Sequence, residues 1–130
     1  MKILLINIFF VFLFFVIGQT TLSDSLIEKY GINKVEFLKI QALVEYINTM
    51  ENAVVIRNDI EYTTVEFAKH LKNKFKNFNN LNILSARDFI EKVASYSSNT
   101  GKAYLLIEKN KKPAPLEYIL LKKLQELELE

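Results

Sequence analysis

Cysteine is absent from the 130-residue chain, and glycine and proline are scarce, with three and two residues. The lack of cysteine excludes a disulfide framework, a thiolate zinc site, a cysteine nucleophile and the lipid-attachment cysteine of a bacterial lipoprotein. The scarcity of glycine and proline leaves little room for long irregular loops. Half of the residues are hydrophobic, which is typical of a globular chain and argues against disorder.

An excess of one charge is also lacking. Lysine and arginine total 17, aspartate and glutamate total 15, and the net charge is +2, of which Lys2 supplies one unit. A nucleic-acid-binding domain usually carries a pronounced basic surface, and a nearly neutral chain does not provide one. We therefore expect no nucleic-acid partner.

A long apolar run occurs only at the N-terminus. Residues 3–17 are apolar apart from Asn7, and the small residues Gly18 and Thr20 follow. A membrane-spanning helix needs ~20 apolar residues, whereas the core of a secretory signal needs about 7–15. We expect residues 1–20 to be a signal peptide and the protein to be exported, either periplasmic or secreted. The alternative is an uncleaved anchor that holds the protein to the inner membrane through residues 3–17 alone.

Hydrophobic periodicity predicts alternating helices and strands beyond the leader. Phe37, Ile40, Leu43 and Ile47 recur at three- and four-residue spacing and mark one buried helix face. The expected helices are residues 34–50, 63–78, 85–96 and 116–127. The expected strands are residues 53–57, 60–62 and 103–108, with turns at 58–59 and 110–114.

Capping signals at the helix starts support this order. Thr63 and Glu66 have the spacing of a capping box, and Ser85 with Asp88 repeats it before the third helix. We predict an α+β fold: a small single domain of residues 34–130, with about four helices packed on a two- to three-stranded, mainly antiparallel sheet, preceded by a signal-peptide helix. Residues 21–33 are expected to be a tether with one loose helical turn.

Residues 97–102, Ser-Ser-Asn-Thr-Gly-Lys, are the densest group of hydrogen-bonding side chains. They are not a phosphate-binding P-loop, because the first glycine is missing, Ala103 follows the lysine and the order is helix-loop-strand. The loop fits a helix stop, in which Gly101 takes a permissive backbone angle and the hydroxyls satisfy turn groups. The alternative is a nucleophilic serine, which needs a base nearby.

His70 and Arg57 are the other candidates for chemistry. His70, the single histidine, follows Glu66 by one helical turn, so that carboxylate could orient a general base or metal ligand. The favoured interpretation is a partly buried histidine that bonds to a neighbouring backbone group or to the polar loop. No cysteine or aspartate cluster completes a metal-ligand set, so we expect no metal and no cofactor. Arg57 ends an apolar strand, where it could clamp an anion, hold loop carbonyls or pair with a carboxylate such as Asp88.

Several of these residues together resemble the YfeK-like family, small exported bacterial proteins classed as a domain of unknown function. The resemblance covers roughly residues 34–108, with Asp59 in place of a glycine and Ala103 in place of a common proline. It implies an exported location and assigns no activity and no catalytic residue. The matching residues are Arg57-Asn58, His70-Leu71, Lys74, Phe89-Ile90, Ser97-Ser98, Thr100-Gly101-Lys102 and Tyr104.

Two functional hypotheses follow. The first is a non-enzymatic exported protein that binds an unknown envelope protein or stabilises the envelope. The second is a pocket that binds a small ligand or anion, or hydrolyses one, with Arg57, His70, Lys74 and Ser97-Ser98 at its centre. A homodimer through the leucine-rich last helix is a further alternative. The candidate binding residues are Arg57, His70, Lys74, Ser97, Ser98, Thr100, Lys102 and Tyr104.

Overall fold

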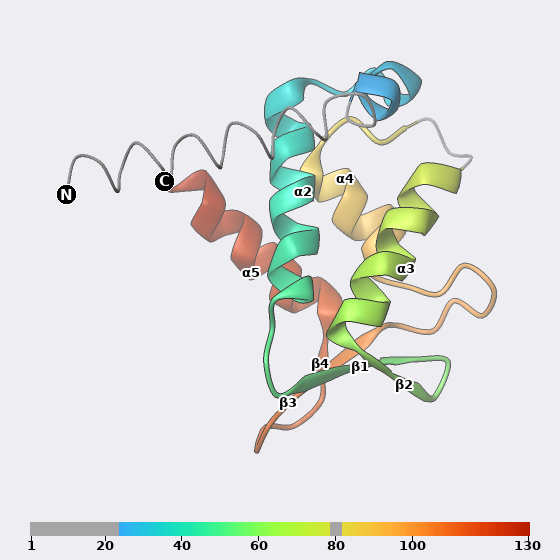
Figure 1. Cartoon of the computed structure of the whole chain (residues 1–130), viewed down its shortest axis with the longest axis vertical. Coiled ribbons are helices and arrows are strands. Elements are labelled where there is room, and N and C mark those ends of the chain that lie inside the picture. Colours follow the sequence, from blue (N-terminus) through green and yellow to red (C-terminus); the bar gives the residue numbers. More distant parts are fainter. Residues whose placement is uncertain (1–23, 79–81) are drawn as a thin grey trace, which may run out of the picture.

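The domain joins helices to one antiparallel sheet, as predicted for an α+β chain (Figure 1). The computed structural model describes residues 24–78 and 82–130. The helices are α2 (Lys34–Asn48), α3 (Thr64–Asn77), α4 (Ala86–Phe89), the π-helix η1 (Ile90–Ala94) and α5 (Leu116–Glu128), and residues 24–30 are helical as well. The strands are β1 (Ala53–Arg57), β2 (Ile60–Thr63), β3 (Leu105–Glu108) and β4 (Ala114–Pro115).

The sheet has the order β2-β1-β3-β4, and every neighbouring pair is antiparallel. Val55 in the centre pairs with Tyr62 on one side and Leu106 on the other, so these three side chains share the face toward the helices. The prediction missed β4, which it assigned to a turn and a helix start. Pro115 is tolerated there because an edge strand needs no amide donor on its open side.

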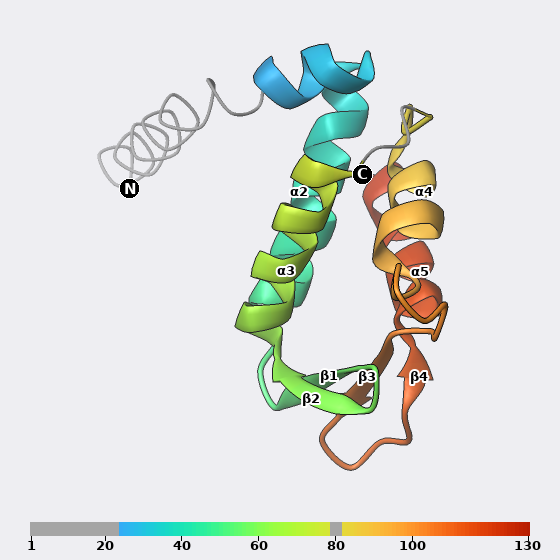
Figure 2. The same cartoon turned by 90° about the vertical axis from the view of Figure 1, so that its right-hand side faces the viewer.

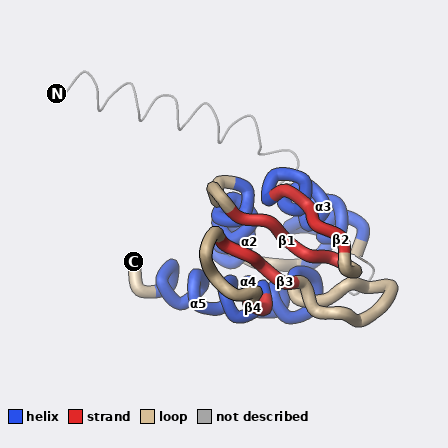
Figure 3. The backbone as a smooth tube through the Cα atoms, turned by 90° about the horizontal axis from the view of Figure 1, so that it is seen from below, coloured by secondary structure: helices blue, strands red, loops and turns tan. Residues whose placement is uncertain are grey.

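The helices form two layers that meet the sheet at one end. In Figure 2, α2 and α3 lie side by side, α4 and α5 lie opposite them, and the sheet crosses the lower ends. Figure 3 shows the four strands from below, lying across these helix ends. Leu116, Leu120 and Leu124 of α5 are buried in this core. The leucines that suggested a homodimer therefore pack within the domain, and dimerisation stays a prediction.

The connection from β1 to α3 follows the predicted local signals. Asn58 and Asp59 both have positive φ, at 51° and 67°, so a two-residue turn forms without glycine. The capping box at α3 is confirmed: Thr63 Oγ1 accepts the Glu66 N–H at 3.1 Å, and Glu66 Oε2 accepts the Thr63 N–H at 3.1 Å. The carboxylate of Glu66 therefore serves the helix start and is not the partner that orients His70.

The expected tether differs from the structure over its described part. Residues 24–30 are helical, and Leu26, Tyr30 and Ile32 are buried. The Tyr30 ring stacks on Phe75 at 5.0 Å, and its hydroxyl donates to the carbonyl oxygens of Phe75 and Phe78. The last carbonyls of a helix have no partner within the helix, and Tyr30 satisfies two of them for α3. The predicted signal peptide, residues 1–20, lies outside the described residues.

The third predicted helix changes type halfway. It begins as expected at Ser85, whose Oγ accepts the Asp88 N–H at 3.0 Å, but residues 90–94 form a π-helix instead of continuing to Tyr96 as an α-helix. The buried Ser95 Oγ donates to the Ile90 carbonyl at 2.6 Å and closes this wider turn. Asp88 Oδ2 accepts the Leu84 N–H at 2.9 Å, so Asp88 serves this helix start instead of pairing with Arg57.

Candidate anion-binding site

Three basic side chains from two elements converge on the hydroxyl of Tyr104. Arg57 ends β1 and shares the inner sheet face with Val55, since side chains alternate along a strand. His70 and Lys74 lie one turn apart on α3 and therefore share a helix face. Tyr104 precedes β3 and is only 1% exposed. The fold brings these residues together from three separate segments of the chain. No local sequence pattern could reveal this grouping.

The contacts around the hydroxyl are specific. Lys74 Nζ donates to Tyr104 Oη at 3.1 Å, and His70 Nε2 lies 3.4 Å from the same oxygen. The Phe67 ring meets the Tyr104 ring edge-on at 4.9 Å and fixes the plane of the ring. Arg57 Nη1 lies 3.5 Å from Tyr62 Oη, so Tyr62 holds the guanidinium from the neighbouring strand.

The π-helix supplies the backbone that holds this site. The Ser95 carbonyl accepts the Tyr104 N–H at 2.9 Å, and the Tyr104 carbonyl accepts the Leu116 N–H at 2.9 Å. Immediately after the π-helix, the Tyr96 carbonyl accepts a bond of 2.6 Å from Lys74 Nζ. Single π-turns occur often at functional sites, because the extra residue redirects the groups that follow. Here the redirected carbonyls anchor both Tyr104 and Lys74.

Among the residues that the structure describes, the basic groups have no acidic partner. None of the ion pairs found within residues 24–78 and 82–130 includes Arg57, His70 or Lys74. Arg57 Nε is buried, and within the same residues no hydrogen-bond acceptor reaches it. Like charges without a counter-ion in a partly buried place cost stability. An arrangement with this cost fits an anion that is supplied from outside.

The pKa values of the site reflect this crowding. Burial, and after it the charges of Arg57 and Lys74, lower the pKa of His70 to about 4, so the ring is neutral at pH 7. Burial and the charge of Arg57 lower the pKa of Lys74 to about 8. Burial raises the pKa of Tyr104, although Arg57 opposes the shift. At pH 7 the site therefore offers one guanidinium, one ammonium, a hydroxyl and a neutral imidazole.

The loop of residues 97–102 is bound to the β1–β2 turn. Asn58 Nδ2 donates to Ser97 Oγ at 3.1 Å, and Thr100 Oγ1 donates to Asn58 Oδ1 at 2.6 Å. Lys102 Nζ forms an ion pair with Asp59 Oδ2 at 2.6 Å. We call these five residues the loop clasp. In the loop clasp, Ser97, Thr100 and Lys102 have structural roles. The clasp holds the loop beside the β1–β2 turn, and Figure 3 shows the two next to each other.

The predicted site residues thus separate into two groups. Arg57, His70 and Lys74 surround the hydroxyl of Tyr104. Ser97, Thr100 and Lys102 belong to the loop clasp. Ser98 is exposed, and no hydrogen bond among residues 24–78 and 82–130 joins it or Ser97 to His70. Sequence reasoning missed two contributors, Tyr62 and the Tyr96 carbonyl. Only the strand register and the π-turn, which depend on tertiary packing, place them at the site.

The donor set suits an anion and not a metal ion. Around Tyr104 the single imidazole of His70 is joined by an ammonium, a guanidinium and hydroxyls, whereas a metal site joins imidazole to thiolate, carboxylate or further imidazole ligands. Over the described part of the chain, no three residues among histidine, cysteine, aspartate and glutamate are grouped in a way that could hold a metal.

The lowered pKa of His70 predicts that the folded protein loses stability in acid because of this one residue. The unfolded chain protonates the ring near its ordinary pKa of 6.5, while the folded ring stays neutral to about 4. The unfolded state therefore binds more protons between these values, and the stability that His70 confers above pH 6.5 falls as the pH drops toward 4. We expect urea denaturation to show a smaller loss over this window for His70→Gln than for the unmodified protein. Parallel pH profiles would contradict the assignment, since the carboxylates common to both proteins cancel in the comparison.

Comparisons with known proteins agree with the motifs. Residues 34–128 match the family model described as "Family of unknown function (DUF5329)". The chain is 35% identical over 74 residues to the "Uncharacterized protein YfeK" of Salmonella typhimurium (strain LT2), and the match covers 57% of this chain and 61% of that relative. No solved structure matches the chain. The chain thus belongs to the DUF5329 family of unknown function and is YfeK-like, as its motifs indicated.

Proposed function

We propose that the protein binds a small oxyanion between Arg57, Lys74 and Tyr104 without transforming it. The observation that carries the proposal is the convergence of basic groups on one hydroxyl with no carboxylate among them. A guanidinium presents paired N–H donors that match two oxygens of a carboxylate, phosphate or sulfate. The ammonium of Lys74 adds a second charge, and the Tyr104 hydroxyl adds a donor.

The site geometry favours binding over hydrolysis. A hydrolytic reaction needs a nucleophile that a nearby base activates. Ser97 is buried and accepts a hydrogen bond from Asn58, and His70 is next to Tyr104, a hydroxyl whose pKa is raised. The proposal therefore takes the anion-binding form of the second hypothesis and leaves hydrolysis out.

The cellular setting is part of the proposal and rests on sequence alone. The apolar run of residues 3–17, with its single lysine before it, supports export. No helix among residues 24–78 and 82–130 combines the length and apolarity that crossing a bilayer requires. Binding of an envelope protein stays a separate prediction.

Anion titration of the purified protein tests the proposal. We expect phosphate, sulfate or acetate, added at constant ionic strength, to cause saturable NMR shifts at Lys74 and Tyr104 and to raise the melting temperature, because a ligand that binds only the folded state stabilises it. Arg57→Gln and Lys74→Gln should each weaken binding at least about tenfold, since each removes a charge-assisted hydrogen bond.

The matched control is Lys72→Gln, which removes an exposed lysine from the same helix. It should leave the affinity unchanged, and circular dichroism should show all three variants folded. Equal weak binding by every variant would show that the lysine-rich helix surface attracts anions without a defined site, and the proposal would then fail.

A further inference from the structure

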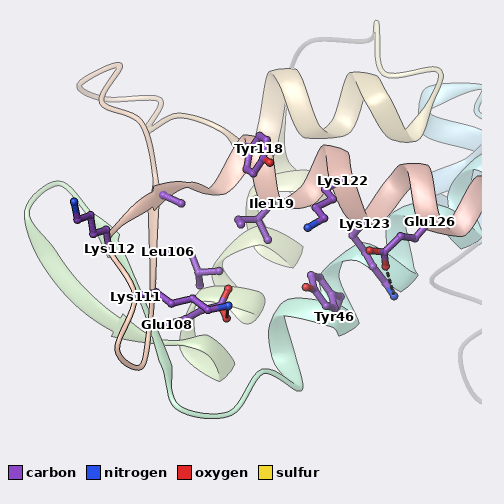
Figure 4. Close-up of a pocket in the computed structure, with 11 residues that line it drawn as sticks. Tyr46, Leu106, Glu108, Lys111, Lys112, Tyr118, Ile119, Lys122, Lys123 and Glu126 are labelled. Atoms are coloured by element: carbon purple, nitrogen blue, oxygen red, sulfur yellow. Dashed lines mark hydrogen bonds and ion pairs between the residues drawn. The ribbon is translucent and has the colours of Figure 1, made fainter.

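A pocket with a volume of about 290 Å³ lies away from Tyr104 (Figure 4). Helix α5, the end of α2, strand β3 and the β3–β4 connection enclose it, and none of Arg57, His70, Lys74 or Tyr104 lines it. Its volume lies near the lower end of the ~300–1,000 Å³ that small-molecule sites usually have. A ligand that fills it is a compact aromatic molecule of two or three rings and not a long lipid chain.

The lining of this pocket combines polar groups with a smaller share of apolar and aromatic surface. Ala114 and Ile119 supply partly exposed aliphatic surface, and Tyr46 and Tyr118 add two rings, while Leu106 behind them is 1% exposed. Figure 4 shows Tyr46, Leu106 and Ile119 coming from different elements around one hollow, with Tyr118 at its edge. Tyr118 is 62% exposed. An exposed ring at the edge of a hollow offers a surface on which a flat ligand can stack.

The rim of the pocket is basic. Lys111, Lys112, Lys122 and Lys123 line it together with Glu108 and Glu126. The Lys111–Glu108 and Lys123–Glu126 contacts, at 3.3 Å and 3.6 Å, are surface pairs of the kind that stabilise a protein little. Within residues 24–78 and 82–130, no ion pair includes Lys112 or Lys122. The rim therefore has positive charge to offer to a ligand.

We infer that this pocket is a second site, which binds an amphipathic organic anion through a flat apolar body and a single carboxylate or sulfonate. The body packs on Ile119 and stacks on Tyr118, while the acidic group reaches Lys122 at the rim. The lysines at the rim favour an anion, and the limited volume of the pocket favours a compact ring system. The site is independent of Tyr104, so each of the two can exist without the other.

Fluorescence titration with anilinonaphthalene sulfonate, a two-part aromatic sulfonate, tests this site in the folded protein. We expect saturable binding with one site per chain. Tyr118→Ala and Lys122→Gln should each weaken it about five- to tenfold, because one removes the stacking ring and the other the charge. Tyr118→Phe should bind normally, since it keeps the ring.

Two controls separate this site from the first. Arg57→Gln should bind the dye normally, and Lys72→Gln should do so as well, because neither residue lines the pocket. Loss of dye binding in Arg57→Gln would place the probe at Tyr104 and overturn the inference. Unsaturable binding, or binding that Tyr118→Ala and Lys122→Gln leave unchanged, would overturn it too.

Discussion

Tyr104→Ala is expected to lower the free energy of unfolding by about 3–5 kcal/mol, the usual cost of removing a large buried ring. The ring is 1% exposed and meets Phe67 edge-on at 4.9 Å. It also lies between the inner sheet face and α3, so a cavity there would separate two layers of the core. A domain of this size has only ~5–15 kcal/mol of stability in total, so the variant should lose a large share of it. Urea denaturation measures the change.

Tyr104→Phe distinguishes the ring from its hydroxyl. This variant keeps the contact with Phe67 and removes the oxygen that Lys74 and His70 approach at 3.1 Å and 3.4 Å. We expect a stability loss of no more than about 1 kcal/mol, the typical net value of one hydrogen bond, together with weaker anion binding. If Tyr104→Phe lost as much stability as Tyr104→Ala, the hydroxyl and not the ring would hold the layers together.

Lys74 is expected to lose its proton near pH 8, more than two pH units below the ordinary lysine value of 10.5. Burial is the main cause, because it removes water from the ammonium, and the charge of Arg57 adds to it. NMR titration of the lysine side chains should show this midpoint. Limited acetylation at pH 8, mapped by mass spectrometry, should modify Lys74 early, since only the neutral amine is nucleophilic.

The lowered pKa of Lys74 also determines how the stability of the protein changes with pH. Between about 8 and 10.5 the unfolded chain keeps the Lys74 proton and the folded chain has lost it. Stability should therefore rise with pH through this window, and the penalty of holding a charged Lys74 is present below it. Lys74→Met, which cannot be charged, should lack this rise.

Arg57→Met tests whether the charge of Arg57 contributes to the lowered pKa of Lys74. It removes the charge and leaves Lys74 as buried as before, so the pKa of Lys74 should rise but stop short of 10.5. A bound oxyanion should raise the same pKa in the unmodified protein, because it supplies the missing counter-charge. An unchanged Lys74 midpoint in Arg57→Met and in saturating anion would show that the two basic groups are not coupled.

These variants also separate stability from binding. Arg57 carries a buried Nε without an acceptor and repels Lys74, so the site holds its basic groups together at a cost to the fold. Sites that need strained or uncompensated groups commonly trade stability for function. Arg57→Met should accordingly bind anions poorly and tolerate urea at least as well as the unmodified protein.

Local features could be predicted from the sequence because their causes lie within a few residues. The apolar spacing in α2, the capping box at Thr63 and Glu66 and the Asn58-Asp59 turn all depend on neighbours in the chain. The motif residues Arg57, His70, Lys74 and Tyr104 were also recognisable as candidates. Their grouping was not, because it needs β1, α3 and β3 to pack in one particular register.

The structure differs from the local prediction at three places. Pro115 ends an edge strand because β3 offers it a partner, and residues 90–94 widen to a π-helix that Ser95 closes. Tyr30 joins the core because the end of α3 has carbonyls to satisfy. Tyr30 and Phe75 are 45 residues apart, so no local pattern could predict their contact. The other two partners are nearer in the chain, but neither pairing produces an apolar periodicity that would reveal it.

His70 shows most clearly what the sequence determines and what only the tertiary structure decides. By itself the sequence determined that a histidine would share a helix face with Lys74, and that Glu66 would lie one turn before it. Only the tertiary structure decided that Glu66 caps the helix while Tyr104, 34 residues further along the chain, meets the imidazole. Helix periodicity is set by backbone geometry, which acts over a few residues. The choice of neighbour is set by burial and register, which act across the whole fold.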